Sequence, residues 1–158
     1  MADDTTFQRC LNAAYRYLSY RARSEAEIRR YLRKLGFSDE VIGETIKRLK
    51  EQGLVDDRTF AQFWRDSRLS SKPRSKRLIA RELKEKKVAQ ETIEQATKNI
   101  DDEENAYTLG RHRMPMLAQL DYPDFQRRLS SYLAYRGFSY EIIRHTVSRL
   151  WREKQGKT

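Results

Sequence analysis

Hydrophobic residues recur at the spacing of an α-helix from the beginning of the chain. The first apolar face is formed by Phe7, Leu11, Ala14, Tyr15 and Leu18. Positions three and four residues apart lie on the same side of a helix, so this spacing predicts a helix here. Two further apolar faces follow, formed by Ile28, Tyr31, Leu32 and Leu35 and by Val41, Ile42, Ile46 and Leu49. The pattern therefore predicts three successive helices in the first third of the chain.

Polar residues and a glycine mark the ends of these helices. Ser24 and Glu27 have the S-x-x-E spacing of a capping box, which opens the second helix. Gly36 suits the left-handed residue that commonly ends a helix. Ser38 is then expected to cap the third helix. Two helices joined by a tight glycine turn are typical of a helix-turn-helix pair.

The same pattern occurs three times along the chain. The Gly-Phe-Ser segment at 36–38 recurs at 137–139, which is an offset of 101 residues. A weaker middle copy lies at an offset of 51, where Ser24 aligns with Ser75 and Leu32 with Leu83. A fixed period of this length indicates a repeat protein. We expect three-helix repeats over residues 1–53, 54–101 and 102–158.

The later repeats differ from the first in their details. Either Asp56 or Asp57 is expected to cap the helix that carries Phe60 and Trp64. Residues 70–75, Ser-Ser-Lys-Pro-Arg-Ser, form the clearest linker. Pro115 is expected to disturb the first helix of the third repeat. The acidic run at 101–104 indicates another helix start.

Composition supports this fold class and excludes several others. The chain is 38% hydrophobic and 35% charged, with two Trp, nine Tyr and six Phe, so it folds into slim layers with much surface. Gly and Pro are too scarce for an all-β domain. We predict an all-α tandem array of three helix-turn-helix-like repeats, elongated and able to curve, because thin repeats must stack to bury their faces.

Other features of the sequence bear on the compartment and on oligomeric state. Cys10 is the only cysteine, which excludes an internal disulfide and fits a reducing cytosol. The sequence has neither a signal-peptide pattern nor an apolar run of the ~20 residues that a membrane span needs. We expect a cytoplasmic monomer without a membrane association and without a cofactor.

Positive charge is concentrated in two clusters. The net charge is +10, and residues 68–88 alone carry nine basic and two acidic side chains. From this segment we select as candidate binding residues Arg68, Lys72, Arg74, Lys76, Arg77 and Arg81. The second cluster supplies Arg21, Arg23, Arg29, Arg30 and Arg33, with Lys34 beside them. Patchy positive charge is typical of a protein that faces phosphates or an acidic protein surface, and a solvated helix face is the alternative.

Few other residues suggest chemistry. Helical spacing favours core positions for Tyr17, Tyr20, Tyr135 and Tyr140, and base stacking is the alternative. The pair Asp56-Asp57 is expected to cap a helix rather than to hold a metal, and His112 and His145 have no ligand-spaced companions. The sequence contains no P-loop and no plausible nucleophile set. We therefore predict a binding protein without a catalytic or metal site.

Several motifs resemble the RecX family of regulators. The most specific is the run Gly-Leu-Val-Asp-Asp at 53–57, followed by Phe60-Ala61, Trp64 and Arg68. The family pattern is also matched by Arg21, Arg23, Ser24 and Glu27 leading to Leu-Gly-Phe at 35–37, by Ile79, Glu82 and Leu83, and by Arg-Gly-Phe at 136–138. The resemblance covers residues 7–152.

The resemblance implies a cytoplasmic bacterial protein that binds the RecA recombinase in recombination, DNA repair and the SOS response. Such proteins lie in the groove of the RecA–single-stranded DNA filament and restrain its ATPase and strand exchange. Contact with the strand itself would be weak or made through the filament. One position departs from the family, because Lys87 stands where a glycine is usual. The alternative is a free-standing helix-turn-helix-like DNA-binding protein, and a small nuclease is disfavoured.

Overall fold

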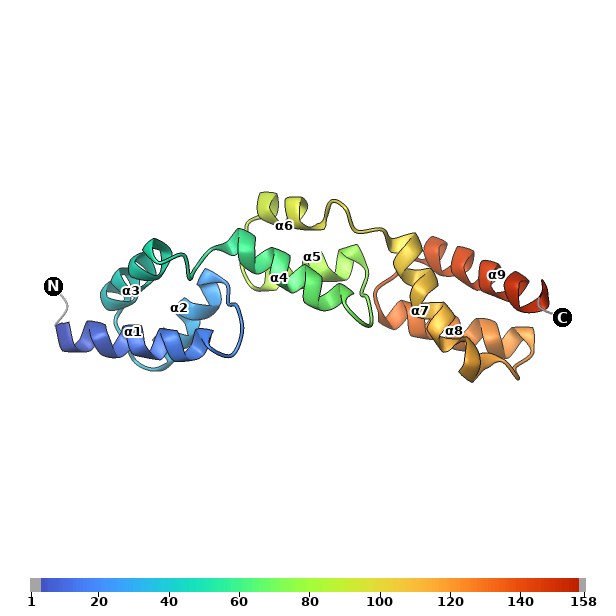
Figure 1. The fold of residues 1–158 in the computed structure, drawn as a ribbon, viewed down its shortest axis with the longest axis horizontal. Helices are drawn as coiled ribbons and strands as arrows, with labels where there is room; N and C mark the ends of the chain where they lie inside the picture. The colour runs from blue at the N-terminus through green and yellow to red at the C-terminus, as the bar shows by residue number, and fades with distance from the viewer. Residues whose placement is uncertain (1–3, 157–158) are drawn as a thin grey trace. The chain divides into compact units, whose positions relative to one another are not determined.

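The computed structural model describes residues 4–156 and, within them, contains nine α-helices and no strand (Figure 1). The helices are α1 Asp4–Leu18, α2 Glu25–Lys34, α3 Asp39–Glu51, α4 Asp57–Leu69, α5 Lys76–Glu85, α6 Gln90–Thr97, α7 Asp102–Leu117, α8 Tyr122–Tyr135 and α9 Tyr140–Gly156. The all-α prediction is confirmed. Three helices fall within each predicted repeat, although the repeat boundaries themselves stay a prediction.

The chain is divided into two compact units that do not coincide with the repeats. The first contains the described residues up to Trp64 together with Glu82–Ala96, and the second contains Arg65–Arg81 together with the described residues from Thr97 to Gly156. The boundaries fall within α4, within α5 and before the last residue of α6. The middle set of helices is therefore shared between the two units.

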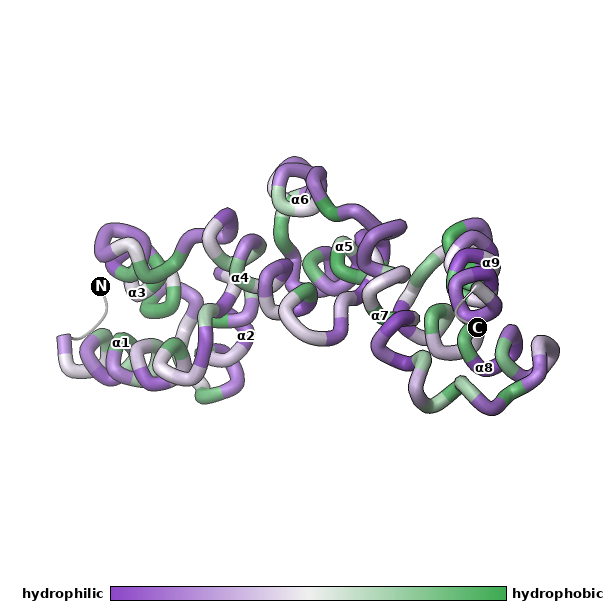
Figure 2. The backbone as a smooth tube through the Cα atoms, turned by 45° about the vertical axis from the view of Figure 1, so that its right-hand side comes forward, coloured by the Kyte–Doolittle hydropathy of each residue, from purple (hydrophilic) through white to green (hydrophobic). Residues whose placement is uncertain are grey.

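Each unit has a core built from the apolar faces that the sequence predicts. The core of the first unit includes Cys10, Leu11, Ala14, Ile28, Leu32, Ile42, Ile46 and Leu49. The core of the second includes Ala106, Leu109, Phe125, Leu129, Leu133, Phe138, Val147 and Leu150. Figure 2 shows such positions as short hydrophobic stretches within helices that are otherwise hydrophilic. Cys10 is completely buried, and burial raises the pKa of its thiol, as expected for a structural cysteine.

The helix caps follow the sequence closely. The Ser24 hydroxyl accepts a hydrogen bond from the Glu27 backbone N–H at 3.1 Å, and the Glu27 carboxylate accepts one from the Ser24 N–H at 2.9 Å. This reciprocal pair is the predicted capping box. Ser38 caps α3, and Asp101 and Asp121 cap α7 and α8. Asp56 caps α4 by accepting the Arg58 N–H at 2.9 Å.

The second helix of each repeat ends in the same turn. Gly36 and Gly137 have φ angles of +95° and +93°, in the left-handed region, and Lys87 adopts φ +62° at the equivalent place. The residue that follows each of them donates its N–H to a carbonyl five residues earlier, from Phe37 to Leu32, from Val88 to Leu83 and from Phe138 to Leu133. Lys87 therefore keeps the turn that glycine makes elsewhere, at a cost of about 1 kcal/mol for a side chain in this conformation.

The proline in the third repeat has a smaller effect than the sequence suggested. Helix α7 contains Pro115 and continues to Leu117. Proline removes one backbone donor and crowds the preceding turn, so its cost is smallest close to a helix end. Pro115 lies within the last turn, and the helix ends two residues after it.

Candidate functional site

Two junctions of the same design join a second helix to the repeat that follows it. The first junction lies within the first unit and comprises Ser24, Glu25, Asp57, Lys86 and Lys87. The Ser24 hydroxyl donates to the Lys86 carbonyl oxygen at 3.0 Å. The Glu25 backbone N–H donates to Asp57 Oδ1 at 2.9 Å. Asp57 of α4 thus caps the start of α2, and the turn after α5 holds the N-cap residue Ser24.

The second junction lies within the second unit and repeats this arrangement. The Lys76 backbone N–H donates to Asp102 Oδ1 at 2.9 Å, as Glu25 does to Asp57. The Ser75 backbone N–H donates to the Arg136 carbonyl oxygen at 3.0 Å. A Cβ placed on Gly137 would lie 2.5 Å from Ser75 Oγ, so glycine is required for this close approach.

The two acceptor aspartates are held in similar surroundings. Burial raises the pKa of Asp57, and the hydrogen bond from the Glu25 backbone offsets only part of this effect. Burial likewise raises the pKa of Asp102, with a partial offset from the Lys76 backbone. Both carboxylates therefore act as caps for helices in the preceding repeat. The sequence predicted that these acidic pairs are caps, but it did not identify the distant helices that Asp57 and Asp102 serve.

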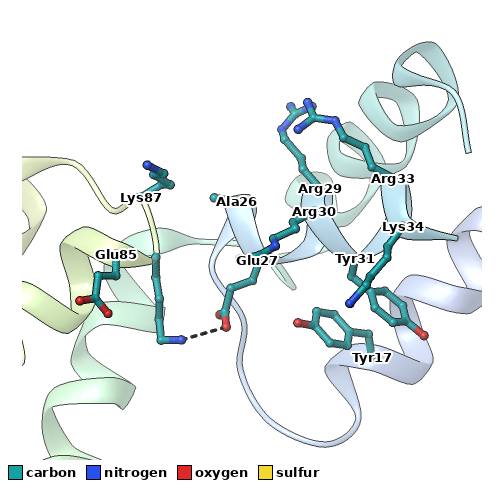
Figure 3. A pocket seen from close by; sticks show the side chains of 11 residues that line it. Tyr17, Ala26, Glu27, Arg29, Arg30, Tyr31, Arg33, Lys34, Glu85 and Lys87 are labelled. Carbon is teal, nitrogen blue, oxygen red and sulfur yellow. Dashed lines mark hydrogen bonds and ion pairs between the residues drawn. The ribbon is translucent and has the colours of Figure 1, made fainter. Parts of the chain in front are cut away.

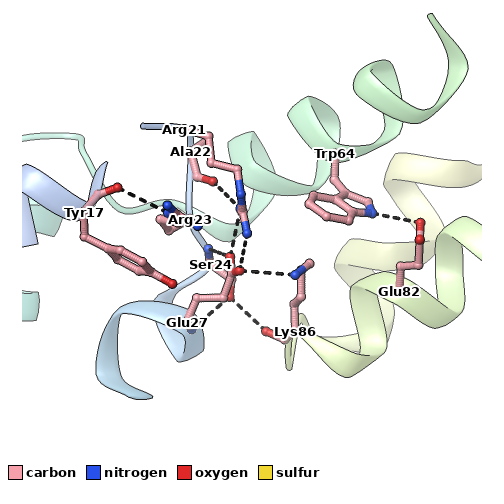
Figure 4. A network of polar contacts seen from close by, with 9 residues as sticks. All are labelled: Tyr17, Arg21, Ala22, Arg23, Ser24, Glu27, Trp64, Glu82 and Lys86. Carbon is pink, nitrogen blue, oxygen red and sulfur yellow. Dashed lines mark hydrogen bonds and ion pairs between the residues drawn. The ribbon is translucent and has the colours of Figure 1, made fainter. Parts of the chain in front are cut away.

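A network of charged and aromatic side chains reinforces the first junction (Figure 4). The Glu27 carboxylate pairs with Arg21 at 2.6 Å and with Lys86 at 3.2 Å. Arg21 and Lys86 both lie over the Trp64 ring, at 5.3 and 4.4 Å from a ring centroid, and Trp64 Nε1 donates to Glu82 at 3.1 Å. Burial alone would raise the pKa of Glu27, but the hydrogen bonds from Arg21, Ser24 and Lys86 outweigh burial and lower it.

A cationic groove of about 620 Å³ opens beside the first junction (Figure 3). We call it the first groove; its lining includes six cations, namely Arg29, Arg30, Arg33 and Lys34 of α2 and Lys86 and Lys87 of the turn after α5. Two acidic side chains, Glu27 and Glu85, also line it. The structure thus brings residues of both predicted clusters together, although they lie more than 50 residues apart in the sequence.

Two predicted binding residues of the second cluster do not line the first groove and have internal partners. Arg21 forms an ion pair with Glu27 and donates a hydrogen bond to the Ala22 carbonyl oxygen at 2.7 Å. Arg23 lies over the Tyr17 ring at 3.8 Å and donates to the Tyr17 carbonyl oxygen at 3.3 Å. Tyr17 in turn stacks on Tyr31, with ring centroids 4.1 Å apart. These contacts give Arg21 and Arg23 a structural role at the edge of the first groove, and their binding role stays a prediction.

A smaller hollow of about 300 Å³ lies at the second junction. We call it the second groove; it is lined by Arg77, Leu78, Arg81, Ala134, Tyr135 and Gly137. Its position corresponds to that of the first groove, because Arg81 aligns with Arg30 and Gly137 with Lys87 at the repeat offsets. Arg77 and Arg81 are exposed and come from α5.

The other candidates from the basic segment lie outside the two grooves. Lys76 begins α5 and is exposed, and Lys72 is exposed in the preceding linker. Arg68 lies in the last turn of α4, and Arg74 lies in the linker; both are half-buried. The linker is also held to the second junction, because Arg136 Nη1 donates to the Lys72 carbonyl oxygen at 3.5 Å.

The core prediction for the tyrosines is wrong at three positions. Tyr20, Tyr135 and Tyr140 are 80%, 82% and 80% exposed. Tyr17 alone of the four is partly covered, through its stack with Tyr31. Helical spacing could not reveal this exposure, because all three residues lie at helix ends: Tyr20 follows α1, Tyr135 is the last residue of α8, and Tyr140 is the first residue of α9. Tyr135 lines the second groove, which gives it a place beside Arg77 and Arg81.

Neither a metal-ligand cluster nor a membrane-spanning helix is found among the described residues. Among residues 4–156, no group of three or more His, Cys, Asp or Glu side chains could hold a metal ion. His145 lies 3.1 Å from Glu103 as an isolated pair. None of the described helices combines the length and the apolar character that a membrane crossing requires.

Known proteins share both the sequence and the fold. Family models for the first, second and third three-helix domains of RecX match residues 10–49, 56–96 and 101–147. The chain belongs to the RecX family. It is 34% identical over 150 residues to "Regulatory protein RecX" of Prosthecochloris aestuarii, covering 95% of this chain and 98% of that one. It is 37% identical over 137 residues to the Mycobacterium avium protein of the same name, covering 84% and 79%.

A solved RecX structure shares this all-helical fold. The crystal structure of RecX from Lactobacillus salivarius matches with a TM-score of 0.76 and 26% identity, over 92% of this chain and 97% of that chain. Several residues of the RecX motifs make the contacts of the two junctions. Arg21, Ser24 and Glu27 form the first capping network, Asp57 caps α2, and Gly137 permits the second junction. Several RecX motif residues thus hold the repeats together, whereas the groove cations lie outside those motifs.

Proposed function

We propose that this chain regulates the RecA recombinase, mainly as an inhibitor, by binding along the groove of the RecA–single-stranded DNA filament. Membership of the RecX family carries this proposal, since its relatives are regulatory proteins. The two cationic grooves support it, because the DNA within such a filament carries phosphates. The setting would be DNA repair and recombination, including the SOS response, in the cytoplasm.

The mechanism we propose is occupancy. A chain of stacked repeats makes many weak contacts, and linked contacts bind a polymer far more tightly than each contact alone. Contacts to several subunits at once would oppose the rearrangement that each ATPase cycle needs. We propose that the protein acts as a monomer and carries out no catalysis of its own. The candidate partner-facing residues are those of the two clusters, of which Arg29, Arg30, Arg33, Arg77 and Arg81 line the grooves.

The direct test is the single-stranded-DNA-dependent ATPase of RecA, measured as this protein is added. Inhibition should saturate, and strand exchange should slow over the same concentration range. An ATPase rate that stays constant at saturating protein would reject the proposal.

The second candidate is a free-standing DNA-binding protein, which the cationic grooves also favour. Such a protein would bind a specific duplex sequence tightly without RecA, with an affinity well above that for other sequences. Comparison of naked DNA with RecA-coated DNA in a single binding assay separates the two candidates.

A further inference from the structure

We propose that the two grooves are direct binding sites for a single nucleic-acid strand, the first for its phosphates and the second for a phosphate with an unstacked base. The inference rests on the proposed function for the identity of the strand. It goes beyond that function by giving the chain a strand-binding activity of its own, located at the junctions between repeats.

The first step concerns cations of the first groove that do not pair with a carboxylate of the protein. Within the described part of the chain, Arg30, Lys34 and Lys87 have no carboxylate partner, and all three are exposed. Arg29 and Arg33 do pair with Glu25 and Asp39, at 2.9 and 3.0 Å. Like charges on successive turns of α2 repel one another slightly, and a bound anion would relieve this repulsion. The first groove therefore favours a ligand with several negative charges.

The second step concerns the kind of anion. Three of the six groove cations are arginines on α2, and the planar guanidinium matches the oxygens of a phosphate. Lys87 lies across the groove from them (Figure 3), Lys86 also lines the groove, and both lysines add point charges. Carboxylates can also bind such a set, so the choice between phosphate and an acidic peptide depends on the second groove.

The third step is the recurrence of the site. The second groove is formed by α5 and by the end of α8 with its turn, which are equivalent to α2 and to the end of α5 with its turn in the first groove. Arg81 stands at the position of Arg30. Two equivalent cationic sites within one chain suit a ligand whose charged unit is itself repeated. The backbone of a nucleic acid carries one negative charge per nucleotide and meets this requirement.

The fourth step is the aromatic side chain in the second groove. Tyr135 is 82% exposed and lines this groove with Arg77 and Arg81. An exposed ring beside arginines is the arrangement that binds a single strand, because an unstacked base covers the ring while the cations bind the phosphates. An acidic peptide has no flat base to place there. The combination favours a single nucleic-acid strand.

The test for the first groove is fluorescence anisotropy of a labelled single-stranded oligonucleotide with the full chain and no RecA. The variant Arg30→Gln/Lys34→Gln/Lys87→Gln removes three groove cations. The matched control Lys47→Gln/Arg58→Gln/Arg144→Gln removes three exposed cations outside both grooves and changes the net charge equally. In plots of log affinity against log salt, the groove variant should lose about 2 from the slope, since each phosphate contact to a single strand contributes about 0.7. The control should keep nearly the wild-type slope.

The test for the second groove is the variant Tyr135→Ala, with Tyr20→Ala as its control. Both residues are about equally exposed, at 82% and 80%, but Tyr20 lines neither groove. Loss of one stacked base should weaken strand binding by about tenfold in Tyr135→Ala, and Tyr20→Ala should bind as the wild type does.

Three results would overturn the inference. Equal losses of affinity in the groove variant and its control would show that only net charge matters. Competition by polyglutamate as effective as that by the oligonucleotide would assign the grooves to an acidic protein. Full strand binding by the groove variant, accompanied by loss of RecA inhibition, would disprove that the first groove binds the strand while leaving the proposed function intact. Conversely, groove-dependent strand binding without any effect on RecA would refute the proposed function alone.

Discussion

The second helix of every repeat ends in a left-handed residue, and in the middle repeat that residue is a lysine. A side chain in this conformation meets the neighbouring carbonyl oxygen, whereas glycine has no Cβ to do so. Lys87→Gly should therefore raise the free energy of unfolding by about 1 kcal/mol, measured by urea denaturation. Lys87→Ala keeps the strain and serves as the control. A glycine variant no more stable than the alanine variant would contradict this account.

The two glycines at the equivalent turns have nearly the same φ but different surroundings. A Cβ on Gly36 would have nothing within 4 Å, whereas a Cβ on Gly137 would lie 2.5 Å from Ser75 Oγ and 2.8 Å from Leu78 Cβ. Gly36→Ala should cost about 1 kcal/mol through backbone strain alone. Gly137→Ala should cost about 1–3 kcal/mol more, because it also overpacks the second junction. Equal losses of stability in the two variants would show that the second junction yields to the added methyl group.

Single-residue signals were the most predictable part of the chain. Ser24, Ser38 and Gly36 act where the sequence placed them, because a cap or a helix end depends on neighbours along the chain. Exposure of Tyr135 was not predictable in this way. It depends on which other elements cover the residue, and a single sequence does not contain that information.

At the scale of helices, the junctions explain why acidic residues come in pairs at the starts of α4 and α7. Asp56 caps its own helix, whereas Asp57 caps α2. Asp57→Ala should lower stability by about 1 kcal/mol, as loss of a helix cap does, and should speed hydrogen exchange of the Glu25 amide. Asp56→Ala is the matched control, and its faster exchange should instead appear at the start of α4. Identical exchange patterns in the two variants would rule out separate roles.

The charged network of the first junction should make stability depend on pH. The folded-state pKa of Glu27 is lowered, because hydrogen bonds from Arg21, Ser24 and Lys86 outweigh the effect of burial. A lowered pKa stabilises the fold above the ordinary glutamate value of about 4.3, and this contribution is lost as the pH falls through the folded value. Glu27→Gln should therefore cost about 2 kcal/mol at neutral pH, and the difference from wild type should shrink in acid.

Urea denaturation of both proteins from neutral pH down to about pH 3 measures this difference. Glu44→Gln removes an exposed acid from α3 and should leave stability nearly unchanged at each pH. A gap between wild type and Glu27→Gln that widens in acid would mean that Glu27 is destabilised rather than stabilised by its partners.

The helices themselves followed from hydrophobic spacing, but the links between them did not. Spacing identifies the faces of α2 and α5 that must be buried. It does not show that Lys86 meets Ser24, since 62 residues separate them. The first groove could not be predicted for the same reason, because its cations come from two clusters that are far apart in the sequence.

At the scale of the whole molecule, ionic strength distinguishes a groove-dependent regulator from one that uses other surfaces. If Arg30, Lys34, Lys87, Arg77 and Arg81 all contact phosphates, a rise from about 50 to about 200 mM salt should raise the half-inhibitory concentration against RecA by about a hundredfold. The variant Arg30→Gln/Lys34→Gln/Lys87→Gln retains two of these contacts and should show a rise of only about sevenfold. Each value is measured against RecA alone at the same salt, because the filament is itself sensitive to salt. Only charges that release counterions on binding increase the salt dependence of the half-inhibitory concentration. Equal salt dependence in wild type and variant would therefore place the inhibitory contacts outside the first groove.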